Sequence, residues 1–247
     1  TVDQLKAQGF EYVLIGIGAD KNSGVKLEGS HQNVFKSLSF LRRFNSGEKL
    51  DLGQHVAVVG AGNTAMDCAR AALRVPGVKD VTVVYRRSFN EIPAYREEYE
   101  EAVEDGVKFR FLTNPERFDA DGSLTCRLME LGAPDEKGRR RPLATDQTVS
   151  FKMDALITAV GEQADTDVLK AMGVPLDDKG WPLLDLETGE TTRSNVFLIG
   201  DVQKGPSSIV AAIGDARRAT DVILKRESLK SHHGDKYWLN ANPAEIT

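Results

Sequence analysis

His55-Val56-Ala57-Val58-Val59-Gly60-Ala61-Gly62-Asn63-Thr64-Ala65 is the stretch that decides the fold, because an apolar run passes into a glycine-rich turn and then into an alanine-rich segment. The apolar run predicts a buried strand, and the alanine-rich segment predicts a helix to about Arg74. A second apolar run, 81–85, follows the turn at Pro76-Gly77. Strand, helix and strand together predict a βαβ unit of about 30 residues, the usual size of this element.

The spacing Gly60-x-Gly62-x-x-Ala65 indicates a nucleotide site at the turn of this unit. Glycines at these positions allow a tight turn and let the backbone approach a pyrophosphate at the positive N-terminus of the helix. The candidate residues at this turn are Gly60, Gly62, Asn63, Thr64 and Ala65. A glycine turn made only for close packing of strand and helix is the alternative interpretation.

The end of the second strand distinguishes the two nicotinamide dinucleotides. A site for NAD usually has an Asp or Glu there, which binds the ribose 2′-hydroxyl. Arg86 and Arg87 occupy this place, and they suit a 2′-phosphate because each guanidinium offers a planar fork of donors and a positive charge. NADP(H) is therefore the expected ligand, and two exposed arginines at the end of an edge strand are the alternative.

Three further apolar runs also end in glycine. They are 10–15 before Gly16 and Gly18, 154–160 before Gly161, and 196–199 before Gly200 and Asp201. Ala159 and Gly161 are expected near the nicotinamide half of the nucleotide, because glycine permits close contact. Helices are predicted at 34–45, at 93–104 and from Ser208 to about 225, and a strand is predicted at 107–112. Two further strands, at 124–131 and 148–151, are predicted on either side of a hairpin tip at 134–141. A capping box between Thr1 and Gln4 predicts an opening helix.

The composition of the 247 residues, with 40% hydrophobic and 28% charged side chains and a formal charge of -5, is that of a globular protein and gives no reason to expect a nucleic-acid partner. No apolar run reaches the roughly 18 residues of a membrane span, and no leader pattern is present, so a cytoplasmic location is expected. Cys68 and Cys126 are too few for an iron-sulfur cluster. His232 and His233 are adjacent and do not face one site, so no metal ligands are expected.

The residues around the glycine turn resemble a known family. Segments 58–70, 84–88 and 91–94 closely resemble the glutamate synthase small-subunit type of flavin-dependent NADPH oxidoreductase, and the similarity continues at 138–141, 154–161 and 197–201. The tail, 234–240, is similar to large bacterial members of this family named for selenate reduction. Because the chain begins with Thr1 in patterned sequence, we expect it to be a piece of such a protein.

This resemblance implies an α/β fold of the two-dinucleotide-binding-domain type. A Rossmann-like NADP-binding domain, built from three layers of sheet and helices, is expected to be inserted into a partial FAD-binding domain. The expected bounds are 1–52 for one part of the FAD domain, 53–161 for the NADPH domain, and 162–247 for the rest of the FAD domain with the tail. The resemblance further implies that Gly16 and Gly18 lie near FAD and that the Asp201 carboxylate, after Gly200, holds its ribityl or phosphate region. By the same resemblance, Ser208 is expected to open a helix whose N-terminus points at the flavin ring. The alternative is purely structural, because strand-end glycines and capping residues are common without a ligand.

The activity implied by the resemblance is hydride transfer from NADPH to FAD, with electrons passing to iron-sulfur centres outside this chain. Redox partners would be iron-sulfur or molybdenum enzymes of a larger complex. We expect no catalytic acid, base or nucleophile in this chain, because the cofactors carry the chemistry. Since no second glycine-rich βαβ pattern precedes Gly16, we expect FAD binding by this chain alone to be weak or absent. The alternatives are a non-catalytic NADPH-sensing module and a nucleotide-binding methyltransferase, for which an acidic residue would be expected in place of Arg86.

Overall fold

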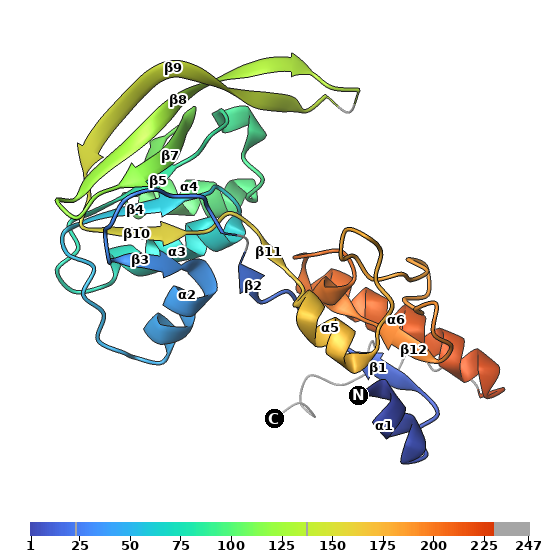
Figure 1. The fold of residues 1–247 in the computed structure, drawn as a ribbon. Coiled ribbons are helices and arrows are strands. Elements are labelled where there is room, and N and C mark those ends of the chain that lie inside the picture. Colours follow the sequence, from blue (N-terminus) through green and yellow to red (C-terminus); the bar gives the residue numbers. More distant parts are fainter. Residues whose placement is uncertain (23, 137, 230–247) are drawn as a thin grey trace, which may run out of the picture. The chain divides into compact units, whose positions relative to one another are not determined.

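The computed structural model describes residues 1–22, 24–136 and 138–229. The chain forms two compact units (Figure 1): unit 1 consists of 1–21 and the segment from Gln163 onward, and unit 2 consists of 22–162. The chain therefore passes between the units twice. Two short strands, β2 (Lys21–Asn22) and β11 (Glu162–Gln163), pair with each other at these two passages.

Unit 2 is built on a five-stranded parallel sheet with the order β3-β10-β4-β5-β6. The strands are β3 (Val34–Lys36), β10 (Ala155–Thr158), β4 (His55–Val59), β5 (Asp80–Val84) and β6 (Lys108–Arg110). Because all five strands run in the same direction, their carboxyl ends meet at one edge of the sheet, which is where ligands bind in open α/β sheets.

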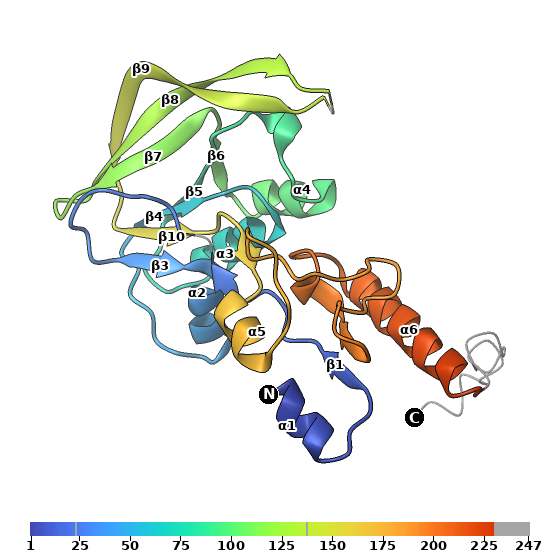
Figure 2. The same ribbon diagram turned by 45° about the vertical axis from the view of Figure 1, so that its right-hand side comes forward.

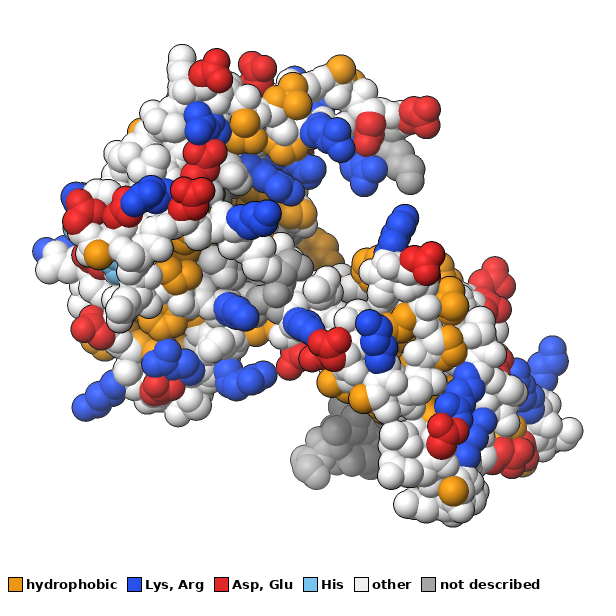
Figure 3. Space-filling view, viewed as in Figure 1, with side chains coloured by type: hydrophobic (Ala, Val, Ile, Leu, Met, Phe, Trp, Pro, Cys, Tyr) orange, Lys and Arg blue, Asp and Glu red, His pale blue; other side chains and the backbone are white. Residues whose placement is uncertain are grey.

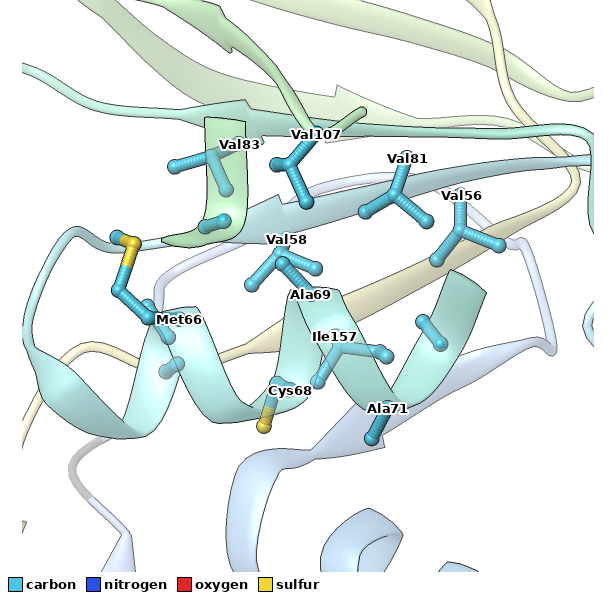
Figure 4. Close-up of a cluster of buried hydrophobic side chains, with 14 of the residues drawn as sticks. Val56, Val58, Met66, Cys68, Ala69, Ala71, Val81, Val83, Val107 and Ile157 are labelled. Carbon is cyan, nitrogen blue, oxygen red and sulfur yellow. The ribbon is translucent and has the colours of Figure 1, made fainter. Parts of the chain in front are cut away.

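One face of this sheet is covered by helices α2 (Ser37–Asn45), α3 (Asn63–Leu73) and α4 (Arg96–Glu104). Alternate strand residues, such as Val56 and Val58, point toward α3 and are fully buried. Figure 4 shows them against Met66 and Ala69 of that helix. Small side chains on α3 let the helix lie close to the sheet, as the alanine-rich sequence predicts.

The other face is covered by an antiparallel sheet of β7 (Thr113–Phe118), β8 (Ser123–Pro134) and β9 (Arg140–Lys152). The intervening strand residues Ala57 and Val59 pack there against Phe118 and Leu124. Unit 2 therefore has three layers, of helices, parallel sheet and antiparallel sheet (Figure 2). Successive residues of β4 point to opposite faces of the parallel sheet. Because HVAVV is apolar on both faces, this strand contributes to both hydrophobic cores.

Unit 1 contains two parallel strands, β1 (Val13–Ile15) and β12 (Val196–Leu198), in the register Val13 to Val196. Their inward residues pack with helices α1 (Val2–Ala7) and α5 (Thr166–Met172). The helix α6 (Ile209–Arg226) follows the 3₁₀ turn Gly200–Val202. The capping box of Thr1 and Gln4 is confirmed at the start of α1.

The prediction that 53 begins the nucleotide domain differs from the structure, in which unit 2 begins at Asn22. The reason is that β3 pairs with β10, and α2 packs on α3, so 22–52 shares the core of the βαβ unit. The second passage lies between Glu162 and Gln163, next to the expected end at Gly161. The segment 46–53, between α2 and β4, is a loop within unit 2.

Several predicted elements have different bounds. The predicted helix 34–45 is wrong in its first turn, because Val34–Lys36 is drawn into the sheet by β10 and the helix begins at Ser37. The helix predicted from Pro93 begins at Arg96, since Ala94 N–H donates to Ala61 O and Tyr95 N–H donates to Asn63 Oδ1, which hold this stretch extended. Strand β7 and helix α5 were not predicted.

No helix within the described residues is long and apolar enough to cross a bilayer. Likewise, the described part of the chain holds no group of three or more His, Cys, Asp or Glu side chains that could bind a metal. The predictions for His232, His233 and the similar tail at 234–240 lie outside the described residues.

Candidate functional site

A pocket of about 550 Å³ lies in unit 2 where β4, β5 and β10 end. Most of the residues expected to bind the nucleotide line it. From the predicted set these are Gly60, Gly62, Arg86, Arg87, Ala159 and Gly161. Figure 3, a space-filling view in the orientation of Figure 1, shows Lys and Arg side chains (blue) on the right-hand side of unit 2, below the part that Figure 1 labels β8 and β9. The topology therefore brings together a turn, a strand end and a second strand end that are up to about a hundred residues apart in sequence.

The two glycines of the turn have different physical reasons to be glycine. Gly60 has φ +122°, and a Cβ there would lie 2.1 Å from Ala159 O, so β4 and β10 approach too closely for any side chain. Gly62 has an ordinary φ of −83°, and a Cβ there would meet only Pro93 Cγ, at 4.0 Å. Nothing in the described chain requires glycine at 62, whereas a ligand phosphate lying on the N-terminus of α3 would require it.

Of the other predicted residues of the turn, Thr64 is half-buried in the first turn of α3, whereas Asn63 and Ala65 have structural partners. Ala65 is fully buried, at the position where a small residue allows close packing of helix and strand. The Asn63 side chain accepts a hydrogen bond from Tyr95 N–H at 2.8 Å. Gly62 is the N-cap of α3 and supplies no side-chain cap, and the first turn of α3 carries no acidic residue. The positive end of α3 is thus left for an anion.

Arg86 and Arg87 follow β5 at the same edge, Arg86 exposed and Arg87 half-buried. The Nε of Arg87 is buried without a hydrogen-bond partner among the described residues, so one strong donor in the pocket wall is unused. The neighbouring Tyr85 donates its hydroxyl to Glu91 O at 2.6 Å, and burial raises its pKa. Glu91 in turn accepts from Ser88 N–H at 3.1 Å, in a capping box that fixes the loop after the arginines.

Residues outside the predicted set also line this pocket. They are Gly24, Val25 and Lys26 before β3, and Asn114 and Pro115 at the start of β7. Nothing in the sequence near Lys26 marks it as part of a βαβ unit, so its place depends on pairing between distant segments. Its neighbour Glu28 donates its N–H to Glu116 O at 2.8 Å and accepts from Phe118 N–H at 2.8 Å.

The charges of the pocket fit a polyanionic nucleotide. The described lining residues include Lys26, Arg86 and Arg87 but no Asp or Glu. In such a pocket, charge-assisted hydrogen bonds from Lys and Arg side chains offset the free-energy cost of removing phosphate groups from water. The open space at Gly62 and the unused Arg87 Nε therefore both suit NADP(H), and the residues present fit this ligand.

The residues expected near FAD lie in unit 1. Gly16 and Gly200 follow the paired strands β1 and β12, so the structure brings these two strand ends together. Gly18 and Gly200 have positive φ, +68° and +73°, and a Cβ at Gly18 would meet open space. Asp201 Oδ1 accepts from Ser207 N–H at 2.9 Å and from its hydroxyl at 2.7 Å.

Ser208 is the N-cap of α6, and its hydroxyl accepts from Ala211 N–H at 3.2 Å. The next two side chains, Ile209 and Val210, are 81% and 78% exposed. The N-terminus of α6 thus combines a positive helix end with exposed apolar side chains.

Both cysteines are free, buried and held in unit 2. Burial raises the pKa of the Cys126 thiol to about 12, and it raises that of Cys68 as well. A thiol that stays protonated at neutral pH is a poor nucleophile and a poor metal ligand. We therefore assign no dithiol or metal-binding role to them.

The fold and the pocket define a nucleotide-binding α/β protein with two compact units. The sequence pattern of the pyridine nucleotide-disulphide oxidoreductase family matches residues 2–216. The chain belongs to this family. Its fold, with a Rossmann-like parallel sheet, is the one predicted from the sequence.

Relatives support the resemblance to glutamate synthase small chains. YgfK of Escherichia coli K12, which carries a provisional oxidoreductase name, is 70% identical over 100% of this chain and 24% of its own length. The beta subunit of the NADP(+)-dependent formate dehydrogenase of Moorella thermoacetica is 36% identical over 89% of this chain and 32% of its own length. The small chain of the NADPH glutamate synthase of E. coli K12 is 31% identical over 87% of this chain and 50% of its own length.

The chain therefore spans a quarter to a half of the length of these curated relatives. Among solved structures, FprA of Mycobacterium tuberculosis in complex with NADPH is similar with a TM-score of 0.76 and 18% identity, over 91% of this chain and 65% of FprA. At this identity the likeness shows the fold alone.

Proposed function

We propose that this chain binds NADPH in the pocket of unit 2 and that the whole protein passes a hydride from it to FAD. The observation that carries the proposal is the pocket at the carboxyl edge of the parallel sheet, in which three cations face no carboxylate among the described lining residues. The names of two relatives, the formate dehydrogenase subunit and the glutamate synthase chain, include NADP(+) or NADPH. These names support the choice of nucleotide.

Each part of the pocket has a share in holding NADPH. Gly62 and the N-terminus of α3 would bind the pyrophosphate, and Arg86 with Arg87 would bind the 2′-phosphate. Ala159 and Gly161, at the end of β10, would lie against the nicotinamide half. In this arrangement the backbone orients the nucleotide and the arginines select NADPH over NADH.

Unit 1 would hold the flavin in the whole protein. Gly16, Gly18 and Gly200 would let the backbone approach FAD closely. The Asp201 carboxylate would accept hydrogen bonds from the ribityl region of FAD. The N-terminus of α6, after Ser208, would stabilise negative charge on the flavin ring. The exposed side chains of Ile209 and Val210 would cover apolar surface of the same ring. When both cofactors are bound, they supply hydride donor and acceptor, and the chain aligns them and excludes water.

Electrons would leave toward centres outside this chain. Cys68 and Cys126 are the only two cysteines, and both are buried, so an iron-sulfur cluster would have to be bound elsewhere. Two relatives are named as a subunit or a small chain, which supports a place in a larger complex. The redox partners that we propose there are iron-sulfur or molybdenum enzymes. We also propose a cytoplasmic location, in which free cysteines are expected to persist. Selenate has no part in this proposal.

The test is calorimetric titration of the chain with NADPH and with NADH, repeated with the variant Arg86→Ala/Arg87→Ala. We expect NADPH to bind at least about tenfold more tightly than NADH, a difference of about 1.4 kcal/mol, and the double variant to lose this difference. Equal binding of the two nucleotides by the unaltered chain would contradict the assignment of the 2′-phosphate.

The second candidate function is an NADPH-sensing module without chemistry of its own. This chain would have that role if unit 1 binds no flavin. Free FAD and a dye acceptor distinguish the two. NADPH-dependent dye reduction above the background of free flavin would exclude the sensing module. No increase, together with NADPH binding, would support it for this chain.

A further inference from the structure

We propose that Lys26 is a nucleotide-binding residue that contacts the pyrophosphate, so that it serves NADPH and NADH alike. This inference rests on the proposed function, because it concerns the same pocket. It assigns a role to a residue that lies outside the βαβ unit, 34 positions before Gly60. Arg86 and Arg87 would then determine the preference between nucleotides, whereas Lys26 would determine affinity for both.

The path of the chain places Lys26 between the two ends of the pocket. The strand β2 ends at Asn22 and pairs with β11, which begins at Glu162 directly after Gly161. Farther along, Glu28 is bonded to β7 through Glu116 and Phe118, next to Asn114 and Pro115. The segment Gly24–Gly29 therefore runs from the nicotinamide side to the β7 side of the pocket. Lys26 lies near the middle of this path, and the pyrophosphate of a dinucleotide lies between its nicotinamide and adenosine halves, so we place the two together.

The same segment is held in place by a close backbone contact. Gly29 has φ +105°, and a Cβ there would lie 2.1 Å from Phe118 O. His31 N–H donates to Phe118 O at 3.1 Å, and the His31 ring stacks on Phe118 with centroids 3.9 Å apart. Lys26 is thus presented by a segment with a fixed backbone rather than by a free loop.

The side chains of the segment alternate. Val25 and Leu27 are half-buried and pack on the core between the two sheets, whereas Lys26 is exposed and lines the pocket. Lys26 has no hydrogen bond or ion pair with any other described residue. Its ammonium is therefore available for a phosphate at little cost, since no existing ion pair has to be broken.

The experiment compares Lys26→Ala with Lys79→Ala in the full chain. Lys79 is an exposed lysine just before β5, at the opposite edge of the sheet, which makes it a matched control. Affinities are measured for NADPH, for NADH by displacement of NADPH, and for adenosine 2′-monophosphate, which carries no pyrophosphate. Melting temperatures check that both variants fold.

We expect Lys26→Ala to lower the affinities for NADPH and for NADH by the same factor, about tenfold, and to leave the affinity for adenosine 2′-monophosphate unchanged. The dependence of NADPH affinity on salt should also become weaker. Lys26→Arg should keep most of the affinity, and Lys79→Ala should keep all of it.

Two results would overturn the inference while leaving the proposed function intact. Unchanged affinities in Lys26→Ala would show that the lysine does not contact the nucleotide. A loss confined to NADPH and adenosine 2′-monophosphate would place it at the 2′-phosphate instead. If the unaltered chain binds no nucleotide at all, the proposed function fails and this inference fails with it.

Discussion

Gly60 and Gly62 stand in the same motif, but at the scale of single residues the structure separates their roles. The positive φ of Gly60 and its contact with Ala159 O are requirements of the fold. Gly62 has neither requirement. The sequence motif predicts both positions without saying which one serves the ligand.

We expect Gly62→Ala to leave the free energy of unfolding within about 0.5 kcal/mol of the original, because the new Cβ meets no atom closer than 4.0 Å. Affinity for NADPH should fall at least about tenfold, since the methyl group occupies the place of the pyrophosphate. Denaturant unfolding and calorimetry measure the two effects. Unchanged affinity would show that Gly62 does not face the nucleotide.

Gly60→Ala is the matched variant for the fold. Backbone strain at positive φ costs roughly 1–3 kcal/mol, and the clash with Ala159 O at 2.1 Å adds to it. We expect a clear loss in the free energy of unfolding, measured by denaturant titration. Stability equal to that of Gly62→Ala would contradict the close approach of β4 and β10.

The two thiols give a prediction about pH. The pKa of Cys126, raised by burial to about 12, exceeds the usual value of about 8.5 in an unfolded chain. The stability that this group contributes is therefore fully present below about pH 8.5 and declines as the pH rises toward 12.

At pH 8 we expect neither cysteine to react with a thiol reagent such as DTNB until the chain is unfolded. Rapid labelling of the folded chain would contradict this burial.

At the scale of elements, the Gly24–Gly29 segment depends on its contact with β7. We expect Gly29→Ala to detach it, because φ is +105° and the Cβ would lie 2.1 Å from Phe118 O. Both stability and NADPH affinity should fall, by at least about 2 kcal/mol for stability. Gly47→Ala is the control, since Gly47 has φ +75° but nothing within 4 Å of its Cβ. An equal loss in both variants would mean that strain alone, without the contact, accounts for the effect.

Elements within the βαβ unit could be predicted closely, and those outside it less so. The strand at 55–59 has the predicted bounds, because its apolar run is continuous and buried on both faces. The local pattern predicts a helix at Val34–Lys36, because it does not show that β10, more than a hundred residues later, pairs with this stretch. Strand β7, TNPERF, carries polar residues and a proline, so its pairing with β8 has little local signal.

At the scale of the whole molecule, unit 2 contains the complete pocket and two hydrophobic cores. We expect residues 22–162 expressed alone to fold cooperatively and to bind NADPH within about threefold of the whole chain, a difference below 1 kcal/mol. Circular dichroism melting and calorimetry test this. A piece that does not fold, or that folds and binds far more weakly, would contradict the assignment of the whole pocket to unit 2.

The βαβ unit, the glycine turn, the arginine pair and the α/β class could all be predicted from the sequence, because they depend on residues close together in the chain. Three features needed the folded chain: 22–52 joins the nucleotide unit, Lys26 and Asn114 line the pocket, and Gly60 is required by the fold. These features come from strand pairing and backbone approach between segments far apart in sequence. Local apolar patterns carry no information about which distant strand becomes the neighbour.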